Sequence, residues 1–220
     1  MAEPIETGCF PVLQYPKWIL FFKRAFDVVV SIVVLLLVWP LLLFVALAVK
    51  LSGPGPVFYR GVRTGLRGIP FRIFKFRTMV ADAERLGGPT TGTRDPRVTR
   101  VGAFLRKTKF DELPQLLNVL RGEMSLVGPR PEVPEYTRRY RGEEALILSM
   151  RPGITDYASV EFADLDDRVG STDPDAYFRE HILPRKNALR VLYVKNWSFT
   201  GDLNILWRTL LRVLKRVFSR

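Results

Sequence analysis

The sequence predicts a mostly helical α+β protein that is embedded in a membrane from one side and carries a larger domain in the cytoplasm. Three observations predict this fold class. Residues 28–49 form one long uncharged segment, basic residues flank it on both sides, and the remaining chain alternates short extended segments with amphipathic helical patterns. We expect a membrane part at 1–51, a cytoplasmic domain at 52–200 and a basic amphipathic helix at 201–220.

The uncharged segment has 22 residues, which meets the roughly 20 that a membrane helix needs. It begins too far into the chain for a cleaved signal peptide, and no small-residue cleavage site follows it. Pro40 stands in its middle, where proline removes a backbone hydrogen bond and kinks or breaks a helix. The flanking basic residues are Lys17, Lys23, Arg24, Lys50, Arg60 and Arg63.

Positive flanks normally stay in the cytoplasm, so both ends of this segment favour the same side of the membrane. We therefore expect a re-entrant helix–break–helix hairpin with its break at Pro40. Each arm would have about 12 to 16 residues and a length of roughly 18 to 24 Å, too short to cross. A proline-kinked single span is the alternative. Asp27 lies at helical spacing from Lys23 and Arg24, which suits an ion pair at the membrane interface or a solvated charge.

The rest of the chain mixes short extended segments with helices. Extended segments are expected at 57–59 and 71–76, and helices at 78–85, 101–109, 113–120, 132–150 and 173–194, the last interrupted near Pro184. Residues 202–218 place Leu203, Leu206, Leu210, Val213, Leu214 and Val217 on one side and basic residues elsewhere. That apolar side fits an anionic membrane surface or the protein core equally well.

The charge balance limits the classes of partner. The chain has 34 Lys and Arg against 22 Asp and Glu, a net charge of +12, which calls for a polyanion such as nucleic acid, anionic lipid or a phosphorylated substrate. No nucleic-acid-binding motif is present, and the charge lies beside a membrane segment, so we expect no nucleic-acid partner. One cysteine and one histidine exclude an internal disulfide and a zinc centre built from Cys and His.

The densest group of charged residues runs from 100 to 131. Three basic residues, Arg106, Lys107 and Lys109, precede the pair Asp111-Glu112, and Pro114 follows. This pattern is typical of a helix N-cap at Asp111. The same geometry also suits chemistry, because a helix N-terminus and nearby arginines attract phosphate.

In that setting, a carboxylate at Asp111 can attack phosphorus and form an acyl phosphate. Glu112 offers an oxygen ligand for Mg²⁺, which prefers oxygen ligands and phosphate partners. Arg130 stands between Pro129 and Pro131, on a stiff loop that costs little entropy to order.

These residues resemble the bacterial sugar transferases, the small monotopic polyprenyl-phosphate phosphoglycosyl transferases. The resemblance covers roughly residues 20 to 160. Its most specific part is LRKTKFDELPQLLNVLRGEMSLVGPRP at 105–131, and the shorter parts are KRAFD at 23–27, GPGPVF at 53–58, FKFRTM at 74–79, DPRVTRVG at 95–102 and RPGIT at 151–155. The chain departs from the family pattern at Trp39, where the family usually has Ser before the proline, and at Asp156, where it often has Gly.

The resemblance implies that Asp111 attacks the β-phosphate of a UDP-sugar and releases UMP, and that undecaprenyl phosphate then accepts the phosphosugar. It implies catalytic roles for Asp111 and Glu112, with Glu112 acting through Mg²⁺. Phosphate or substrate binding is implied for Arg106, Arg130, Lys75, Arg77, Pro129 and Pro131, and a place in the membrane hairpin for Lys23, Arg24, Asp27 and Pro40. The catalytic domain would lie on the cytoplasmic face of the bacterial inner membrane.

Two other functions stay open on the residues alone. One is a glycosyltransferase that releases UDP instead of UMP, and the other is a membrane-anchored basic module that binds lipid without turnover. The sequence does not identify the sugar or the pathway that uses the product. It also leaves the oligomeric state open, a homodimer included.

Overall fold

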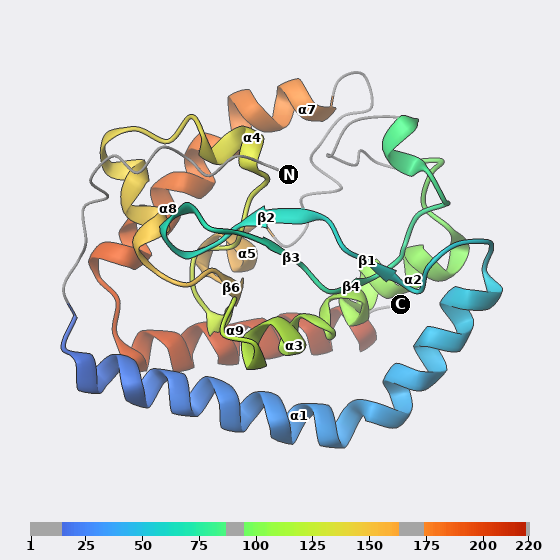
Figure 1. Cartoon of the computed structure of the whole chain (residues 1–220), viewed down its shortest axis with the longest axis horizontal. Helices are drawn as coiled ribbons and strands as arrows, with labels where there is room; N and C mark the ends of the chain where they lie inside the picture. The colour runs from blue at the N-terminus through green and yellow to red at the C-terminus, as the bar shows by residue number, and fades with distance from the viewer. Residues whose placement is uncertain (1–14, 87–94, 163–173, 219–220) are drawn as a thin grey trace.

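The computed structural model describes residues 15–86, 95–162 and 174–218, and Figure 1 shows their arrangement. One long helix, α1 (Lys17–Leu51), runs along the lower edge of the molecule and bends upward at its end. Shorter helices and three two-stranded sheets lie above it, and the first turn of the C-terminal helix α9 (Phe199–Phe218) contacts α1 through Phe199 and Asp202. The expected mostly helical fold with few short strands is confirmed.

Helix α1 is long and apolar enough to cross a membrane by length and composition. Only 11% of its most apolar stretch is buried inside the protein, whereas the core helix of a soluble protein is mostly buried. The helix contains Pro40 and continues through it. The structure therefore has a bent, uninterrupted helix where the sequence suggested a break, because one proline removes a single backbone hydrogen bond. Re-entry into one leaflet stays a prediction.

The charged residues at the start of α1 hold it to the rest of the protein. Lys23 is buried and donates to Asp202 of α9 at 2.6 Å and to the carbonyl of Val127 at 3.0 Å. Asp27 is also buried and accepts from the hydroxyl of Ser125 at 2.7 Å and the backbone N–H of Leu126 at 3.2 Å.

Arg24 donates to the carbonyl of Leu120 at 3.2 Å. Both sequence interpretations of Asp27, an ion pair within the helix and a solvated charge, are wrong. The reason is that the partners come from distant segments that the fold brings against α1.

The strands are short. Three of the six described strands overlap the extended segments predicted at 57–59 and 71–76, and the other three were not predicted. Strand β1 (Phe58–Tyr59) pairs antiparallel with β4 (Lys75–Phe76), and β2 (Val62–Thr64) pairs antiparallel with β3 (Pro70–Arg72). Strand β5 (Ser125–Val127) pairs in parallel with β6 (Gly153–Thr155). A short 3₁₀ turn, η1 (Leu66–Gly68), lies between β2 and β3.

The helix predicted at 78–85 is wrong. Met79 instead forms an isolated β-bridge with Val98, and only a 3₁₀ turn, η2 (Ala83–Arg85), follows. Asp82 has a left-handed φ of 58°, which a continuing helix does not allow.

The helices that carry the site follow the predicted order. They are α2 (Arg100–Thr108), η3 (Phe110–Glu112), α3 (Gln115–Leu120), α4 (Pro134–Thr137), η4 (Gly142–Ser149), α5 (Tyr157–Glu161), α7 (Pro174–Tyr177), η5 (Phe178–Ile182) and α8 (Leu183–Lys195). The single helix expected at 132–150 is instead α4 and the 3₁₀ segment η4, separated at Gly142, whose φ is positive. The helix expected from 173 is described from Pro174 and contains a π-helical turn, η5, before Pro184.

The core lies between α1, α3, β5, α8 and α9. Its fully buried members include Val119, Met124, Val194 and Ile205. Helix α9 packs on the core through Ile205, which lies outside the predicted apolar side, and through Leu206, which belongs to it. Other apolar side chains of α9 remain exposed: Leu203, Trp207, Leu210, Leu211 and Leu214. Contact of that exposed face with a membrane stays a prediction.

Candidate active site

Asp111 and Glu112 lie in a tight turn between two helices. Lys109 adopts a left-handed conformation with φ 61°, which ends α2, and the chain then makes the 3₁₀ turn η3. Helix α3 begins only at Gln115, and the residue before it, Pro114, offers no side-chain cap. The predicted N-cap role of Asp111 is therefore wrong, since the turn places its carboxylate ahead of the helix without bonding to it.

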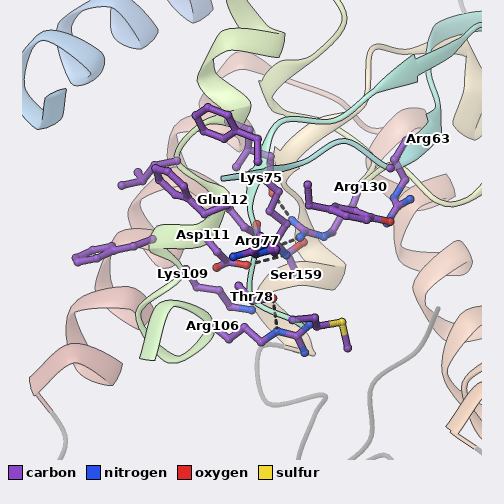
Figure 2. A pocket seen from close by; sticks show the side chains of 18 of the residues that line it. Arg63, Lys75, Arg77, Thr78, Arg106, Lys109, Asp111, Glu112, Arg130 and Ser159 are labelled. Atoms are coloured by element: carbon purple, nitrogen blue, oxygen red, sulfur yellow. Dashed lines mark hydrogen bonds and ion pairs between the residues drawn. The ribbon is translucent and has the colours of Figure 1, made fainter. Parts of the chain in front are cut away.

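The carboxylate of Asp111 is buried but almost unpartnered. The residue is 1% exposed, and its Oδ2 lies 2.9 Å from Nζ of Lys75. Within the described part of the chain, neither oxygen has a partner with hydrogen-bonding geometry. Buried oxygens normally have such partners, so a carboxylate with free lone pairs indicates a functional position. Figure 2 shows Lys75, Asp111 and Glu112 close together at the centre of the site.

Glu112 is in contrast fully engaged by cations. Its Oε1 accepts from Arg130 at 2.5 Å and from Lys75 at 3.3 Å. Burial alone would raise the pKa of Glu112, but the charges of Arg130, Lys75 and Lys109 outweigh burial and hold this pKa well below its usual value. For Lys75, burial would lower the pKa, and the two carboxylates Asp111 and Glu112 raise it instead. Glu112 and Lys75 are therefore both charged at neutral pH.

This charged centre opens into a cavity of about 1550 Å³. Ligand sites usually have roughly 300 to 1,000 Å³, so the cavity has room for more than one small ligand. Its walls come from β4, η3 and α5 and from Leu206 and Thr209 of α9, and Val34 of α1 also reaches it. In Figure 2, Arg106 and Thr78 lie on one side of the carboxylates and Arg63 lies on the other.

Most of the predicted phosphate-binding residues lie together here. Arg106 lines the cavity and donates from Nε to the hydroxyl of Thr78 at 3.0 Å. Arg130 also lines it, and donates to the carbonyl of Ile154 at 2.7 Å in addition to Glu112. Pro129 and Pro131 flank this arginine, and the Pro129 carbonyl accepts from the N–H of Gly153 at 3.1 Å, which fixes the loop to β6.

Arg77 lines the cavity and is also bonded to the backbone. Its guanidinium donates to the carbonyls of Gly53 at 2.7 Å and Val49 at 3.1 Å, and also to that of Pro54. These carbonyls lie at the end of α1 and in the turn after it, so Arg77 fastens this end of α1, and phosphate binding by Arg77 stays a prediction. Lys23, Arg24, Asp27 and Pro40 belong to α1, where the first three fasten the helix to the protein.

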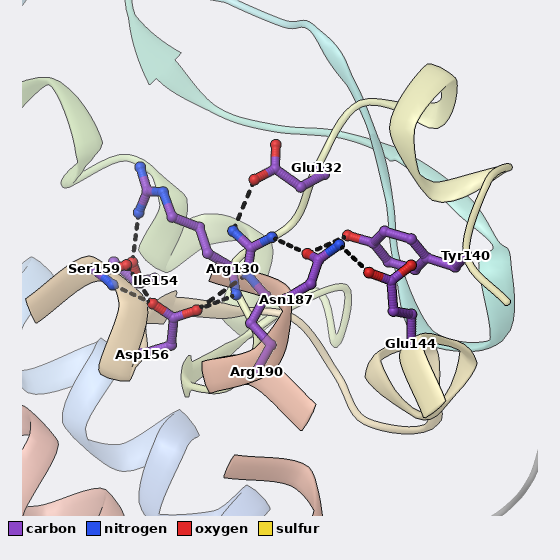
Figure 3. A network of polar contacts seen from close by, with 9 residues as sticks. All are labelled: Arg130, Glu132, Tyr140, Glu144, Ile154, Asp156, Ser159, Asn187 and Arg190. Atoms are coloured by element: carbon purple, nitrogen blue, oxygen red, sulfur yellow. Dashed lines mark hydrogen bonds and ion pairs between the residues drawn. The ribbon is translucent and has the colours of Figure 1, made fainter. Parts of the chain in front are cut away.

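A buried polar network behind Arg130 was not predicted. Arg190 of α8 is 1% exposed and contacts Glu132 at 2.7 Å and Asp156 at 3.4 Å, as Figure 3 shows. Asp156 also accepts from the backbone N–H of Arg130 at 2.9 Å and caps α5 through the N–H of Ser159. The sequence contained one sign of this network: Asp156 stands at a position where the family often has Gly. Arg190 offered none, because on a predicted helix it looks like a solvated charge.

The carboxylates of the site fit Mg²⁺ only if the substrate supplies further oxygen ligands. In the described part of the chain, no three acidic, histidine or cysteine side chains gather as a metal site. Glu112 supplies one carboxylate, and its neighbour Asp111 supplies a second, which pairs with Lys75 alone among the described residues. Because Mg²⁺ is often held by one or two carboxylates together with substrate phosphates, these residues fit an ion that arrives with a diphosphate, held by Glu112.

A sequence model described as bacterial sugar transferase matches residues 18–216 of the chain. The chain belongs to this family. The match includes α1, the centre at Asp111 and Glu112 and nearly all of α9. The predicted family is confirmed.

Among curated relatives, this sugar transferase is 43% identical over 201 residues to the UDP-glucose:undecaprenyl-phosphate glucose-1-phosphate transferase of Caulobacter vibrioides, covering 85% of this chain and 67% of that protein. It is 40% identical to the exopolysaccharide production protein PSS of Rhizobium leguminosarum, covering 88% and 96%. It is 38% identical to the undecaprenyl-phosphate glucose phosphotransferase of Komagataeibacter xylinus, covering 93% of this chain but only 37% of that protein. The chain thus spans little more than a third of the longest of these three.

Proposed function

We propose that this sugar transferase moves a sugar 1-phosphate from a UDP-sugar to undecaprenyl phosphate and releases UMP. The observation that carries the proposal is the buried carboxylate of Asp111 in the wall of a large cavity. Its one close polar contact among the described residues is the ion pair of Oδ2 with Lys75 at 2.9 Å. Two of the three relatives above are named for transfer of glucose phosphate to this lipid, which supports the same reaction here.

In the first proposed step, an oxygen of Asp111 attacks the β-phosphorus of the donor. The bond from that phosphorus to the bridging oxygen breaks, UMP leaves, and the sugar phosphate stays on Asp111 as an acyl phosphate. Lys75, 2.9 Å from the attacking carboxylate, would orient it and offset the negative charge of the approaching diphosphate.

In the second step, a phosphate oxygen of the lipid attacks the same phosphorus. The bond to Asp111 breaks, the carboxylate is restored, and a lipid-linked sugar diphosphate leaves. A two-step path suits this cavity, because one reactive carboxylate serves a donor and an acceptor that need not be bound together. The resulting kinetics would be ping-pong.

The cations of the site would neutralise the phosphate charge of the donor. Arg106, Arg130 and Lys75 line the cavity around the carboxylates and would bind the donor diphosphate. Glu112 would hold Mg²⁺, which supplies further neutralisation of phosphate charge when bound. Glu112 would exchange part of its contact with Arg130 for the ion, and this would free the guanidinium for the substrate.

The proposed place of action is the cytoplasmic face of the bacterial inner membrane. Helix α1 carries the apolar surface for membrane association, and basic residues lie on both of its flanks. A re-entrant path keeps the cavity on the side where UDP-sugars are made, while Val34 of α1 lines that cavity and brings it near lipid.

The first experiment is nucleotide release. The full chain, purified in nanodiscs, is mixed with undecaprenyl phosphate, Mg²⁺ and a panel of UDP-sugars that begins with UDP-glucose. UMP release that depends on one sugar supports the proposal and identifies the donor. UDP release would mean a glycosyltransferase, and salt-sensitive lipid binding without nucleotide release from any donor would mean a lipid-binding module.

A further inference from the structure

We infer that Lys186 of α8, together with Arg63 of β2, forms a second anion-binding site in the cavity, which holds a phosphate monoester. This inference rests on the proposed function, because it assigns a task to the part of the same cavity that the reaction at Asp111 does not use. Two phosphate monoesters take part in that reaction, the released UMP and the lipid phosphate.

Lys186 is buried and has no partner of its own. The residue is only 8% exposed, and it lines the cavity. Among the described residues, its ammonium group makes no hydrogen bond and no ion pair, and its one specific contact is with the ring of Phe178, 5.1 Å away. A buried ammonium without a counter-ion costs stability, so it is retained where a ligand supplies the counter-ion.

The acidic groups nearest to Lys186 are already used. Glu132 and Asp156 both contact Arg190, and Asp156 also accepts from the backbone of Arg130 and from Ser159, as Figure 3 shows. Burial alone would raise the pKa values of these two carboxyl groups, but Arg190 and the other partners lower both. Arg190 therefore makes the close contacts with both carboxylates, whereas Lys186 acts on Glu132 through its charge alone, without a hydrogen bond.

Arg63 lines the same cavity and also has few partners. Its guanidinium donates only to the carbonyl of its neighbour Val62, at 2.8 Å, within the described residues. Lys186 and Arg63 both line the cavity, and the charge of each helps to lower the pKa of Glu132. In Figure 2, Arg130 lies between Arg63 and the carboxylates, and it contacts Glu112.

The charge of Lys186 suits an anionic ligand that binds reversibly. Burial lowers the pKa of Lys186, and the positive charges of Arg190 and Arg130 lower it further. The negative charges of Glu132 and Asp156 act in the opposite direction and offset part of this effect, so that the pKa is about 8. The lysine is thus mostly protonated at neutral pH and loses its proton just above. A phosphate dianion would accept from it directly, and such charge-assisted hydrogen bonds are among the strongest in proteins.

The test compares Lys186→Met and Lys186→Arg with wild type. Lys195→Met is the matched control, because Lys195 lies on the same helix in an exposed ion pair with Glu143. Calorimetry measures binding of UMP and of inorganic phosphate, and steady-state kinetics measure the KM for undecaprenyl phosphate. Lys186→Met should weaken one of these by about tenfold or more, while Lys186→Arg and Lys195→Met stay near wild type.

Weaker UMP binding would assign the site to the nucleotide, and a raised lipid KM would assign it to the acceptor. In wild type the affected constant should worsen as pH rises through 8, and in Lys186→Arg it should stay flat, since arginine keeps its proton. Lys186→Met should also unfold at the same or a higher temperature than wild type, because it removes a desolvated charge.

Unchanged UMP, phosphate and lipid constants in Lys186→Met would overturn the inference, and so would a loss of thermal stability large enough to explain the change. Failure of the proposed function has a different signature. In that case wild type would release no UMP from any donor, yet the binding measurements with UMP and phosphate would still decide the role of Lys186.

Discussion

At the scale of single residues, Asp111 and Glu112 are neighbours with opposite surroundings. Glu112 is held by two cations, Arg130 at 2.5 Å and Lys75 at 3.3 Å, whereas among the described residues Asp111 pairs with Lys75 alone, through Oδ2 at 2.9 Å. A carboxylate saturated by cations is a poor nucleophile because its lone pairs are occupied, and a carboxylate with free lone pairs is available to attack. This contrast assigns the proposed nucleophile to Asp111 and the supporting role to Glu112.

Replacement of the proposed nucleophile should abolish the reaction. Asp111→Asn keeps the shape of the side chain but removes the attacking oxygen, so UMP release should fall by on the order of 10³-fold or more. Labelled sugar phosphate should no longer be trapped on the protein. Glu143→Gln, at an exposed acid outside the cavity, is the control and should behave as wild type. UMP release by Asp111→Asn at a rate near that of wild type would contradict the mechanism.

The buried network behind Arg130 should contribute strongly to stability. Arg190→Met leaves Glu132 and Asp156 without their buried counter-charge, so unfolding in detergent should show a loss of about 3 to 5 kcal/mol at neutral pH. Because their pKa values are lowered in the folded protein, the stabilisation is present above the unfolded pKa values of 3.8 and 4.5 and is lost as pH falls through the lower folded values.

The difference in stability between wild type and Arg190→Met should therefore shrink in acid. A difference that stays constant from pH 7 to pH 3 would mean that packing, and not the ion pairs, accounts for the loss. Lys195→Met again serves as the exposed control on α8.

At the scale of elements, α1 is fastened to the catalytic part by buried polar contacts. Asp27→Ala leaves the hydroxyl of Ser125 and the N–H of Leu126 without their acceptor, and it also removes a charge near Lys23. We expect a loss of about 2 to 4 kcal/mol in unfolding measurements in detergent. Asp27→Asn, which keeps one acceptor oxygen, should lose less. Equal losses for the two variants would show that the hydrogen bonds to β5 do not matter.

Helix α9 presents one face to the core and leaves a second apolar face exposed. Trp207 and Leu210 are 60% and 49% exposed, and we expect them to lie in the membrane surface. An environment-sensitive dye on Leu210→Cys, in a Cys9→Ser background, should be blue-shifted in anionic vesicles and quenched by brominated lipid. The same dye on Arg208→Cys, on the opposite side of the helix, should respond much less. Equal responses at both positions would rule out this orientation.

At the scale of the whole molecule, the sequence predicted many of the helices and several residues that line the cavity, but not the long-range contacts. Asp111, Glu112, Arg106 and Arg130 were singled out because they lie within one local motif. Arg190 and the partners of Asp27 were missed because a charge on a helix looks solvated until distant segments bury it. The helix predicted at 78–85 was wrong because local propensity carries no information about the bridge between Met79 and Val98.

The path of α1 through the membrane is the largest prediction that remains. A straight helix of 35 residues would measure about 52 Å, well above the roughly 30 Å of a bilayer core, so length alone permits a full crossing. The bend of α1 in Figure 1 and the basic residues on both flanks favour re-entry. The two paths place the chain before and after α1 on the same side or on opposite sides of the membrane.

Labelling by a membrane-impermeant maleimide separates these paths. Cys9 precedes α1 and is the single cysteine of the chain, and Ile69→Cys in a Cys9→Ser background places one at a 64% exposed position after it. If α1 is re-entrant from the cytoplasm, neither cysteine should react in intact spheroplasts, and both should react after lysis. Reaction of one of them in intact spheroplasts would mean that α1 crosses the membrane, and the bend would then be a kink within a single span.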